Sequence, residues 1–210
     1  VSMDLTKGQR DVMEADSSLL VTGGPGSGKT TISILKAARV AERDLCPGQK
    51  ILFLSFARAT VSRVVEAITY EQKIPPAQKR LIDVETYHSF FWRILKAHGY
   101  LIGLPRRLSI LTPPGEAIAL SSVRSAFPAR RLTDGQRAAK KATEEAERVR
   151  LASEEGRVCF DLFAPKVGDL LHGSARIRRL IFSMYPVIIL DEFQDTNIPQ
   201  YRIAQQLADK

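Results

Sequence analysis

Cysteine is scarce in this chain of 210 residues, which holds only Cys46 and Cys159, and these do not form a CxxC pair. That scarcity argues against a disulfide framework and against a cysteine-based zinc site, and it fits a reducing compartment. Apolar runs of the roughly 18 residues needed to cross a membrane are also lacking. The first residues show no apolar stretch of the signal-peptide type. With 44% hydrophobic and 26% charged residues, we expect a globular, cytoplasmic protein rather than a disordered one.

Positive charge is in excess and is unevenly distributed. The chain has 31 Lys and Arg against 23 Asp and Glu, a net charge of +8. Residues 101–180 alone hold 15 basic and nine acidic residues. A local basic surplus is what a polyanionic partner requires, although a solubilising surface accounts for it equally well.

Three short apolar runs, at 19–21, 51–54 and 187–190, are typical of strands that are buried on both faces of a parallel sheet. Helical periodicity follows the first two runs, over 30–43 and over 58–70. This alternation predicts an α/β fold with a parallel sheet.

About 130 residues separate the second and third runs, too many for a single crossover connection. Helical patterns over 86–97, 115–127 and 134–155 occupy much of this stretch. The last begins with a capping box at Thr133 and ends at Gly156. We therefore expect a mostly helical insertion in the α/β domain.

The strongest chemical signal is the GxxxxGK[ST] pattern at residues 23–30, which lies between an expected strand and an expected helix. Glycines let backbone N–H groups turn inward around phosphate oxygens, and the helix dipole favours the same anion. Lys29 would reach the β- and γ-phosphates, and the Thr30 hydroxyl would hold Mg²⁺. The predicted nucleotide-binding residues here are Gly23, Gly24, Pro25, Gly26, Ser27, Gly28, Lys29, Thr30 and Thr31.

The second signal is an apolar run that ends in two acids, Asp191 and Glu192. A P-loop needs such a partner: Asp191 would bind Mg²⁺ at the end of the strand, and Glu192 would polarise the attacking water as general base.

Residues 191–197, Asp-Glu-Phe-Gln-Asp-Thr-Asn, resemble the DEFQDTN signature of superfamily 1 DNA helicases of the UvrD/Rep type. Other segments match that family in the same order: residues 5–10 resemble the Q motif, 55–59 motif Ia, and 86–90 motif Ib. The resemblance implies a RecA-like P-loop core and ATP-dependent helicase or translocase activity, with Mg²⁺ and ATP. It also implies that Gln9 reads the adenine edge, and that Gln194 contacts the γ-phosphate region and couples hydrolysis to movement.

In this family, motifs Ia and Ib line a groove for single-stranded DNA. Aromatic rings would stack on bases, while hydroxyl and basic groups would bind phosphates. The residues so assigned are Phe56, Arg58, Thr86, Tyr87, His88 and Ser89. Two departures stand out: Ala57 and Arg58 replace the usual Thr-Asn pair, and Tyr87 replaces the commoner Phe.

The resemblance further implies a RecA-like core formed by 1–100 and 175–210 and a helical insertion at 101–174. Motifs III to VI are absent from these residues. We expect a C-terminal helicase domain as partner, which would supply the arginine fingers, and little turnover by these residues alone. The polarity implied by the family is 3′ to 5′.

One alternative stays open at this point, namely a nucleotide-gated DNA-binding or recruitment module that does not unwind. A P-loop kinase is disfavoured by the 191–197 string. The sequence does not decide between DNA and RNA, because contacts to a 2′-hydroxyl are not readable from it.

Overall fold

A computed structural model describes residues 5–24, 26–72, 74–128 and 131–208. The chain divides into two compact units, and we describe each by itself. Unit 1 comprises residues 1–87, 176–197 and 204–210, and unit 2 comprises 88–175 and 198–203. Unit 2 begins at residue 88, earlier than the insertion expected over 101–174. Within unit 2, Trp92 stacks on Phe163.

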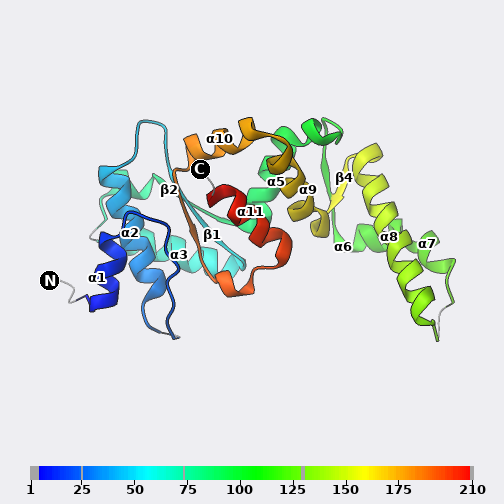
Figure 1. Ribbon diagram of the computed structural model, residues 1–210, viewed down its shortest axis with the longest axis horizontal. Coiled ribbons are helices and arrows are strands. Elements are labelled where there is room, and N and C mark those ends of the chain that lie inside the picture. Colours follow the sequence, from blue (N-terminus) through cyan, green and yellow to red (C-terminus); the bar gives the residue numbers. More distant parts are fainter. Residues whose placement is uncertain (1–4, 25, 73, 129–130, 209–210) are drawn as a thin grey trace. The chain divides into compact units, whose positions relative to one another are not determined.

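Unit 1 is built on a three-stranded parallel sheet with the order β2-β1-β5. The central strand β1 (Ile51–Ser55) is buried at all five positions. It pairs on one side with β2 (Ile82–Thr86) and on the other with β5 (Val187–Leu190). Figure 1 shows these strands running together through unit 1. This confirms the α/β class and the parallel sheet expected from sequence.

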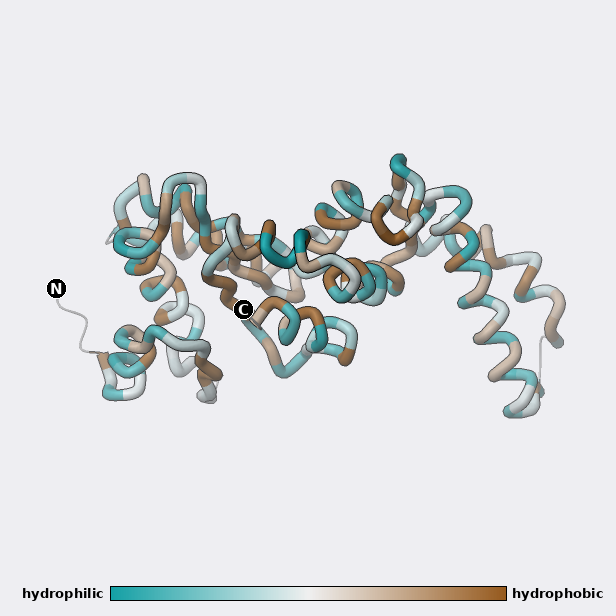
Figure 2. Tube along the Cα trace, turned by 45° about the horizontal axis from the view of Figure 1, so that its top comes forward, coloured by the Kyte–Doolittle hydropathy of each residue, from teal (hydrophilic) through white to brown (hydrophobic). Residues whose placement is uncertain are grey.

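Helices cover the sheet because their apolar residues recur on one face. The helices α2 (Lys29–Arg43) and α3 (Arg58–Tyr70) match the predicted spans to within a residue, and both contribute to the core. Figure 2 shows brown, hydrophobic segments along the central strands of this unit. The other helices that lie wholly or largely in unit 1 are α1 (Lys7–Glu14), α4 (Pro76–Lys79), α10 (Ala175–Met184) and η3 (Phe193–Asp195). The core cluster contains Ile34, Ala37, Ala38, Val40, Ala41, Ile51, Phe53, Val64, Ile68, Ile74 and Ile82.

One expected strand is wrong: residues 19–21 form no strand, and Leu19 and Leu20 are 50% and 76% exposed. A run of apolar, β-favouring residues becomes a strand only where its backbone N–H and C=O groups find a ladder partner. Among the described residues the sheet ends at β5, and no ladder reaches 19–21.

One strand was missed, β2, because its sequence Ile-Asp-Val-Glu-Thr alternates with acids and makes no apolar run. Its Asp83 carboxylate accepts hydrogen bonds from Lys50 Nζ at 2.7 Å and from the Tyr185 hydroxyl at 2.9 Å. These bonds satisfy a half-buried charge next to the start of β1.

Unit 2 is mostly helical, as predicted, around a two-stranded parallel sheet of β3 (Ser109–Leu111) and β4 (Arg157–Cys159). The long helix α8 (Asp134–Glu155) has the predicted bounds, with the Thr133 capping box formed and Gly156 in the left-handed conformation at its end. The single helix expected over 115–127 is instead two, which meet at the buried Leu120. The helices of this unit are α5 (Tyr87–His98), η1 (Gly99–Ile102), α6 (Pro113–Ala119), α7 (Ser121–Ser125), α8, η2 (Phe160–Leu162) and α9 (Phe163–Gly173). The final helix α11 (Ile198–Ala208) contributes residues to both units.

Ion pairs fix α8 to its neighbours in unit 2. Arg148 Nε lies 2.7 Å from Glu116 of α6 and Nη2 lies 3.4 Å from Glu144, and these side chains are less than one-fifth exposed. Arg124 of α7 bonds the same Glu144 at 3.1 Å. Pairing on this scale offsets the desolvation of charges that are largely removed from water.

Across the described residues, no helix has both the length and the apolar character that a membrane span requires.

The turn at Gly156 gives a test of this packing. Its φ is +67°, and a Cβ there would lie 2.4 Å from the Arg107 carbonyl oxygen. We expect Gly156→Ala to lower the free energy of unfolding by more than about 1 kcal/mol, from the left-handed backbone and the collision together. Gly168, inside α9 with open space around it, is the matched control. Gly168→Ala should raise stability by about 0.5–1 kcal/mol, and equal effects in urea unfolding would contradict the turn assignment.

Candidate functional site

The glycine-rich loop leads directly into α2 with a backbone that requires glycine. Gly26 and Gly28 have φ of +75° and +80°, and Gly28 is the N-cap of α2. A Cβ on Gly23 would lie 2.7 Å from Ser27 Oγ and 3.3 Å from Ser27 Cβ, so a side chain there would displace the Ser27 side chain. Pro25 lies outside the described residues. The result is a backbone turn at a helix N-terminus, the arrangement that binds phosphate.

The side chain of Lys29 is held inside this loop by backbone carbonyl groups of the loop. Its Nζ donates to the carbonyl oxygens of Gly23 at 2.7 Å and Gly24 at 2.9 Å. An ammonium has three donors, and the loop uses two of them without any anion. A bound phosphate would therefore meet a lysine already aimed at the loop.

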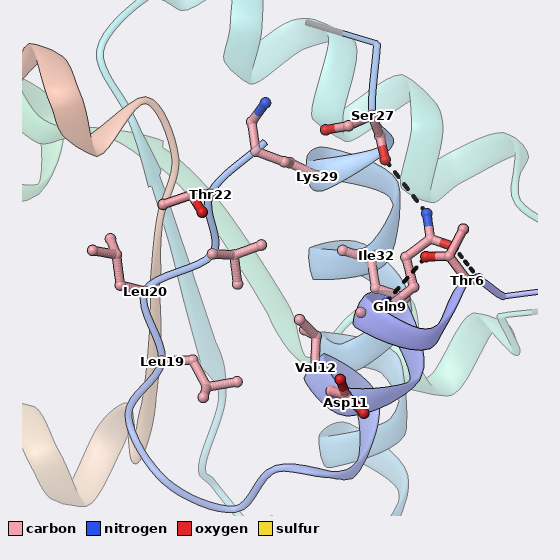
Figure 3. Close-up of a pocket in the computed structure, with 12 residues that line it drawn as sticks. Thr6, Gln9, Asp11, Val12, Leu19, Leu20, Thr22, Ser27, Lys29 and Ile32 are labelled. Atoms are coloured by element: carbon pink, nitrogen blue, oxygen red, sulfur yellow. Dashed lines mark hydrogen bonds between the residues drawn. The ribbon is translucent and has the colours of Figure 1, made fainter. Parts of the chain in front are cut away.

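Gln9 reaches the same loop from α1. Thr6 and Gln9 form a capping box at the start of α1, and Gln9 Nε2 also donates to the Ser27 carbonyl oxygen at 3.4 Å (Figure 3). The other end of α1 is held by Lys36 of α2, whose Nζ donates to the carbonyl oxygens of Met13 and Ala15 at 2.9 and 2.6 Å. The structure thus brings Gln9, Ser27 and Lys29 together at one loop.

A pocket of about 340 Å³ lies between α1, the loop and segment 19–22. Figure 3 shows that segment as an irregular stretch opposite α1. The pocket combines apolar walls with a few polar groups, which is the usual composition of a small-molecule site. Its lining residues are Thr6, Gly8, Gln9, Asp11, Val12, Leu19, Leu20, Val21, Thr22, Ser27, Lys29 and Ile32.

Asp191 lies at the carboxyl end of β5, where its backbone N–H donates to the Leu54 carbonyl oxygen at 2.9 Å. Its Oδ2 is buried and makes no hydrogen bond with the described residues. Burial and then the charge of Glu192 raise the pKa of Asp191, while a backbone hydrogen bond and the charge of Lys29 oppose the rise. A buried carboxylate oxygen without a partner fits a divalent cation, since Mg²⁺ prefers such ligands. Thr30, on the first turn of α2, is half-buried, and Thr31 is exposed.

Glu192 has a φ of +53°, which is unusual for a residue with a Cβ. Its carboxylate accepts a hydrogen bond from Gln194 Nε2. Glu192 and Gln194, predicted as catalytic from the sequence, are therefore in direct contact. Backbone strain of this kind tends to occur at functional sites.

The DNA-side residues predicted in unit 1 differ in their exposure. Arg58 is exposed, and Phe56 is half-buried with its ring 4.6 Å from that of Tyr87 at an interplanar angle of 32°. Thr86 and Tyr87 are buried, at 8% and 2% exposed. Only Phe56 and Arg58 of this group offer surface to a ligand.

In unit 2, His88 and Ser89 are both exposed. The His88 ring meets Phe160 edge-on, with centroids 5.7 Å apart, and Trp92 stacks on Phe163 at 5.3 Å. Phe160 keeps 37% of its surface exposed. Sequence reasoning missed Phe160: two phenylalanines three residues apart predict a shared helical face, but not which of them is at the surface.

Comparison with known proteins matches residues 5–153 and 124–210 to the family model for the UvrD/REP helicase N-terminal domain. A putative ATP-dependent DNA helicase, YjcD of Bacillus subtilis, is 26% identical over 94% of this chain and 29% of its own length. ATP-dependent DNA helicase PcrA of Staphylococcus aureus is 24% identical over 98% of the chain and 31% of its own length. A probable DNA helicase II homolog of Rickettsia conorii is 22% identical over 95% and 34%.

The chain thus spans about a third of the length of the curated relatives that it matches. The family match nevertheless extends over nearly all of it and includes the loop at 23–30 and the acidic pair at 191–192. By this match, the chain belongs to the UvrD/REP helicase N-terminal domain family.

Proposed function

We propose that these residues bind Mg-ATP and form the ATP-binding part of an ATP-dependent DNA helicase or translocase that moves on single-stranded DNA. One observation carries the proposal. The Lys29 ammonium lies within the glycine-rich loop, and its positive charge acts on the Asp191 carboxylate of the same unit. Oδ2 of that carboxylate has no hydrogen-bond partner among the described residues. A cation and an unpaired carboxylate near one loop provide for both the phosphates and the metal.

The nucleotide roles follow from this placement. The loop backbone and Lys29 would bind the phosphates, and Gln9, fixed by its capping box beside Ser27, would contact the base. Thr30 and Asp191 would hold Mg²⁺, which neutralises phosphate charge when bound. The loop residues proposed to take part are Gly23, Gly24, Pro25, Gly26, Ser27, Gly28, Lys29, Thr30 and Thr31.

Glu192 would accept the proton of the attacking water. Gln194 Nε2 donates to one carboxylate oxygen of Glu192, and the other oxygen remains available to accept a hydrogen bond from water. We propose that Gln194 orients this base and, as the family resemblance implies, contacts the γ-phosphate region.

For DNA, we propose two contact groups, Phe56 with Arg58 in unit 1 and His88 with Ser89 and Phe160 in unit 2. The exposed ring of Phe160 and the exposed His88 offer π-faces to unstacked bases, while Arg58 and the Ser89 hydroxyl would meet phosphates. Thr86 and Tyr87 are buried, and we do not propose that they contact DNA. Movement would be 3′ to 5′, as in the family, with a C-terminal helicase domain as partner.

Two substitutions separate nucleotide binding from chemistry. Lys29→Ala should weaken Mg-ATP binding at least about tenfold, because a charge-assisted phosphate contact is lost. Glu192→Gln should leave binding within about twofold and abolish hydrolysis, because only the base is altered. Titration calorimetry and a phosphate-release assay measure the two quantities. Lys79→Ala, which removes a lysine charge outside the loop, is the control, and a loss of affinity there equal to that of Lys29→Ala would sink the assignment.

We expect the Asp191 carboxylate to lower the stability of the folded protein at neutral pH, although we propose that it binds Mg²⁺. Because its folded pKa is raised, the folded state holds the proton more tightly than the unfolded state, so the carboxylate destabilises the protein once pH rises above that pKa. Asp191→Asn should therefore raise the melting temperature at pH 7, with a smaller gain near pH 4, and should remove the Mg²⁺ dependence of nucleotide binding. Equal melting curves at pH 7, or Mg²⁺ dependence kept in the variant, would rule out this role.

Single-stranded DNA should bind without sequence preference. The logarithm of affinity should fall with the logarithm of salt concentration by about 0.7 per phosphate neutralised. Phe160→Ala should weaken binding by about 1–3 kcal/mol through lost base stacking. Tyr70→Ala is the matched control, since Tyr70 is 79% exposed but ends α3 at the opposite end from Arg58. Fluorescence anisotropy with a labelled oligonucleotide measures each, and salt-independent binding would contradict the proposal.

A further inference from the structure

The helix α1 carries Gln9 but has little packing of its own. None of its eight residues is buried, and a helix this short is not stable in water by itself. Its capping box joins Thr6 and Gln9 and does not attach α1 to the rest of the unit. The position of Gln9 beside the phosphate-binding loop therefore depends on the contacts that α1 makes with its neighbours.

Lys36 of α2 holds the other end of this helix. Its Nζ donates to the carbonyl oxygens of Met13 and Ala15, at 2.9 and 2.6 Å, and Ala15 is the C-cap of α1. The last carbonyls of a helix have no partner within it and form its negative end, so a half-buried ammonium stabilises that end. Lys36 follows Lys29 by about two turns of α2. One helix thus bears both the lysine of the phosphate loop and the lysine that holds α1.

The contact with Ala15 lies where the chain leaves α1 and continues towards segment 19–22. Both α1 and that segment line the pocket, and Figure 3 shows Val12 and Leu19 on its facing sides. Segment 19–22 belongs to no strand among the described residues, so no ladder fixes its position. Lys36 itself does not line the pocket. It therefore acts on the pocket only through the backbone that joins the two walls.

The Gln9 amide is oriented but not saturated. Its Oε1 accepts a hydrogen bond from the Thr6 backbone N–H at 3.0 Å, and its Nε2 donates to the Ser27 carbonyl oxygen at 3.4 Å. One N–H and one acceptor site remain on the same amide. The adenine edge presents an acceptor at N7 beside a donor at N6, which pairs with such an amide, whereas guanine presents two acceptors, N7 and O6. An amide held in one orientation can therefore tell the two bases apart.

We propose that Lys36 is a positioning residue for base recognition: it holds Gln9 at the loop, so that the site prefers adenine to guanine nucleotides. This inference rests on the proposed function, in which Gln9 contacts the base. Without the Lys36 ammonium, the end of α1 and the start of the next segment lose their common anchor, and the Gln9 amide no longer keeps one orientation. The glycine-rich loop and Lys29 keep their own hydrogen bonds, so the phosphate contacts remain.

The test compares three probes, Mg-ATPγS, Mg-GTPγS and Mg-tripolyphosphate, by titration calorimetry. The unaltered chain should bind Mg-ATPγS about tenfold or more tightly than Mg-GTPγS, as expected for an amide that pairs with one base edge. Lys36→Met keeps the apolar stem and removes the ammonium, so this preference should fall to within about twofold. Its affinity for Mg-tripolyphosphate, which has no base, should stay within about twofold of the unaltered value. Lys36→Arg, which keeps the charge and the donors, should recover most of the preference.

Lys79→Met is the matched control. Lys79 is also half-buried, and its Nζ donates to the Thr69 carbonyl oxygen in the last turn of α3, a helix that does not line the pocket. Both variants remove a lysine from a helix end and should lower the melting temperature to a similar extent, yet only Lys36→Met should lose the preference. Should Lys36→Met not fold, Lys36→Gln, which keeps an amide donor at this position, carries the same comparison.

The outcomes distinguish this inference from the function on which it rests. A chain that binds neither Mg-ATPγS nor Mg-tripolyphosphate refutes the proposed function. A chain that binds Mg-ATPγS without preference over Mg-GTPγS, or keeps its preference in Lys36→Met, overturns the role of Lys36 and leaves the proposed function standing. Equal loss of preference in Lys79→Met also overturns it, because loss of stability would then be the cause. Equal loss of affinity for Mg-ATPγS and Mg-tripolyphosphate in Lys36→Met overturns it as well, because the effect would then lie in the phosphate loop.

Discussion

Two ladders of parallel hydrogen bonds, one along each side of β1, set the positions of everything else in unit 1. Because the strands are parallel, their carboxyl ends meet at one edge, where backbone ends without ladder partners and polar side chains collect. The ladder with β5 continues one residue beyond the strand, through the N–H of Asp191 to the carbonyl of Leu54. That single bond fixes the backbone of Asp191 at the carboxyl edge of the sheet. The fully buried residues of β1 make the arrangement rigid.

The polar groups at this edge lower the stability of the fold. Asp191 and Ser55 each bury an oxygen without a partner, and Glu192 adopts a left-handed backbone. A buried polar group without a hydrogen bond costs about 1–3 kcal/mol, and a ligand that supplies the missing partner recovers that free energy. Such an edge favours a ligand that supplies the missing partners, which is the part we propose for Mg²⁺.

Charge is distributed differently in the fold than in the sequence. The basic surplus of residues 101–180 suggested a broad surface for a polyanion. In the folded chain, however, Arg148 lies against Glu116 and Glu144, and Arg150 against Glu147, Glu154 and Glu155. These pairs hold α8 in unit 2 and neutralise much of its positive charge locally. A DNA contact in this unit is better assigned to the exposed His88 and Phe160 than to the net charge of the insertion.

Local patterns were enough to predict much of the molecule. The glycines at 26 and 28 have the backbone that the phosphate-binding pattern requires, and the capping box at Thr133 and the stop at Gly156 delimit α8 as expected, because these signals depend on neighbouring residues only. The tertiary structure decided what depends on distant partners. The apolar run at 19–21 stays irregular because no described strand pairs with it, and the acid-rich β2 becomes a strand because β1, Lys50 and Tyr185 satisfy it. Likewise, a tyrosine expected on a DNA surface is buried against Phe56, and a phenylalanine that carries no motif is exposed beside His88. Burial and pairing are properties of the assembled chain, so no local pattern could assign them.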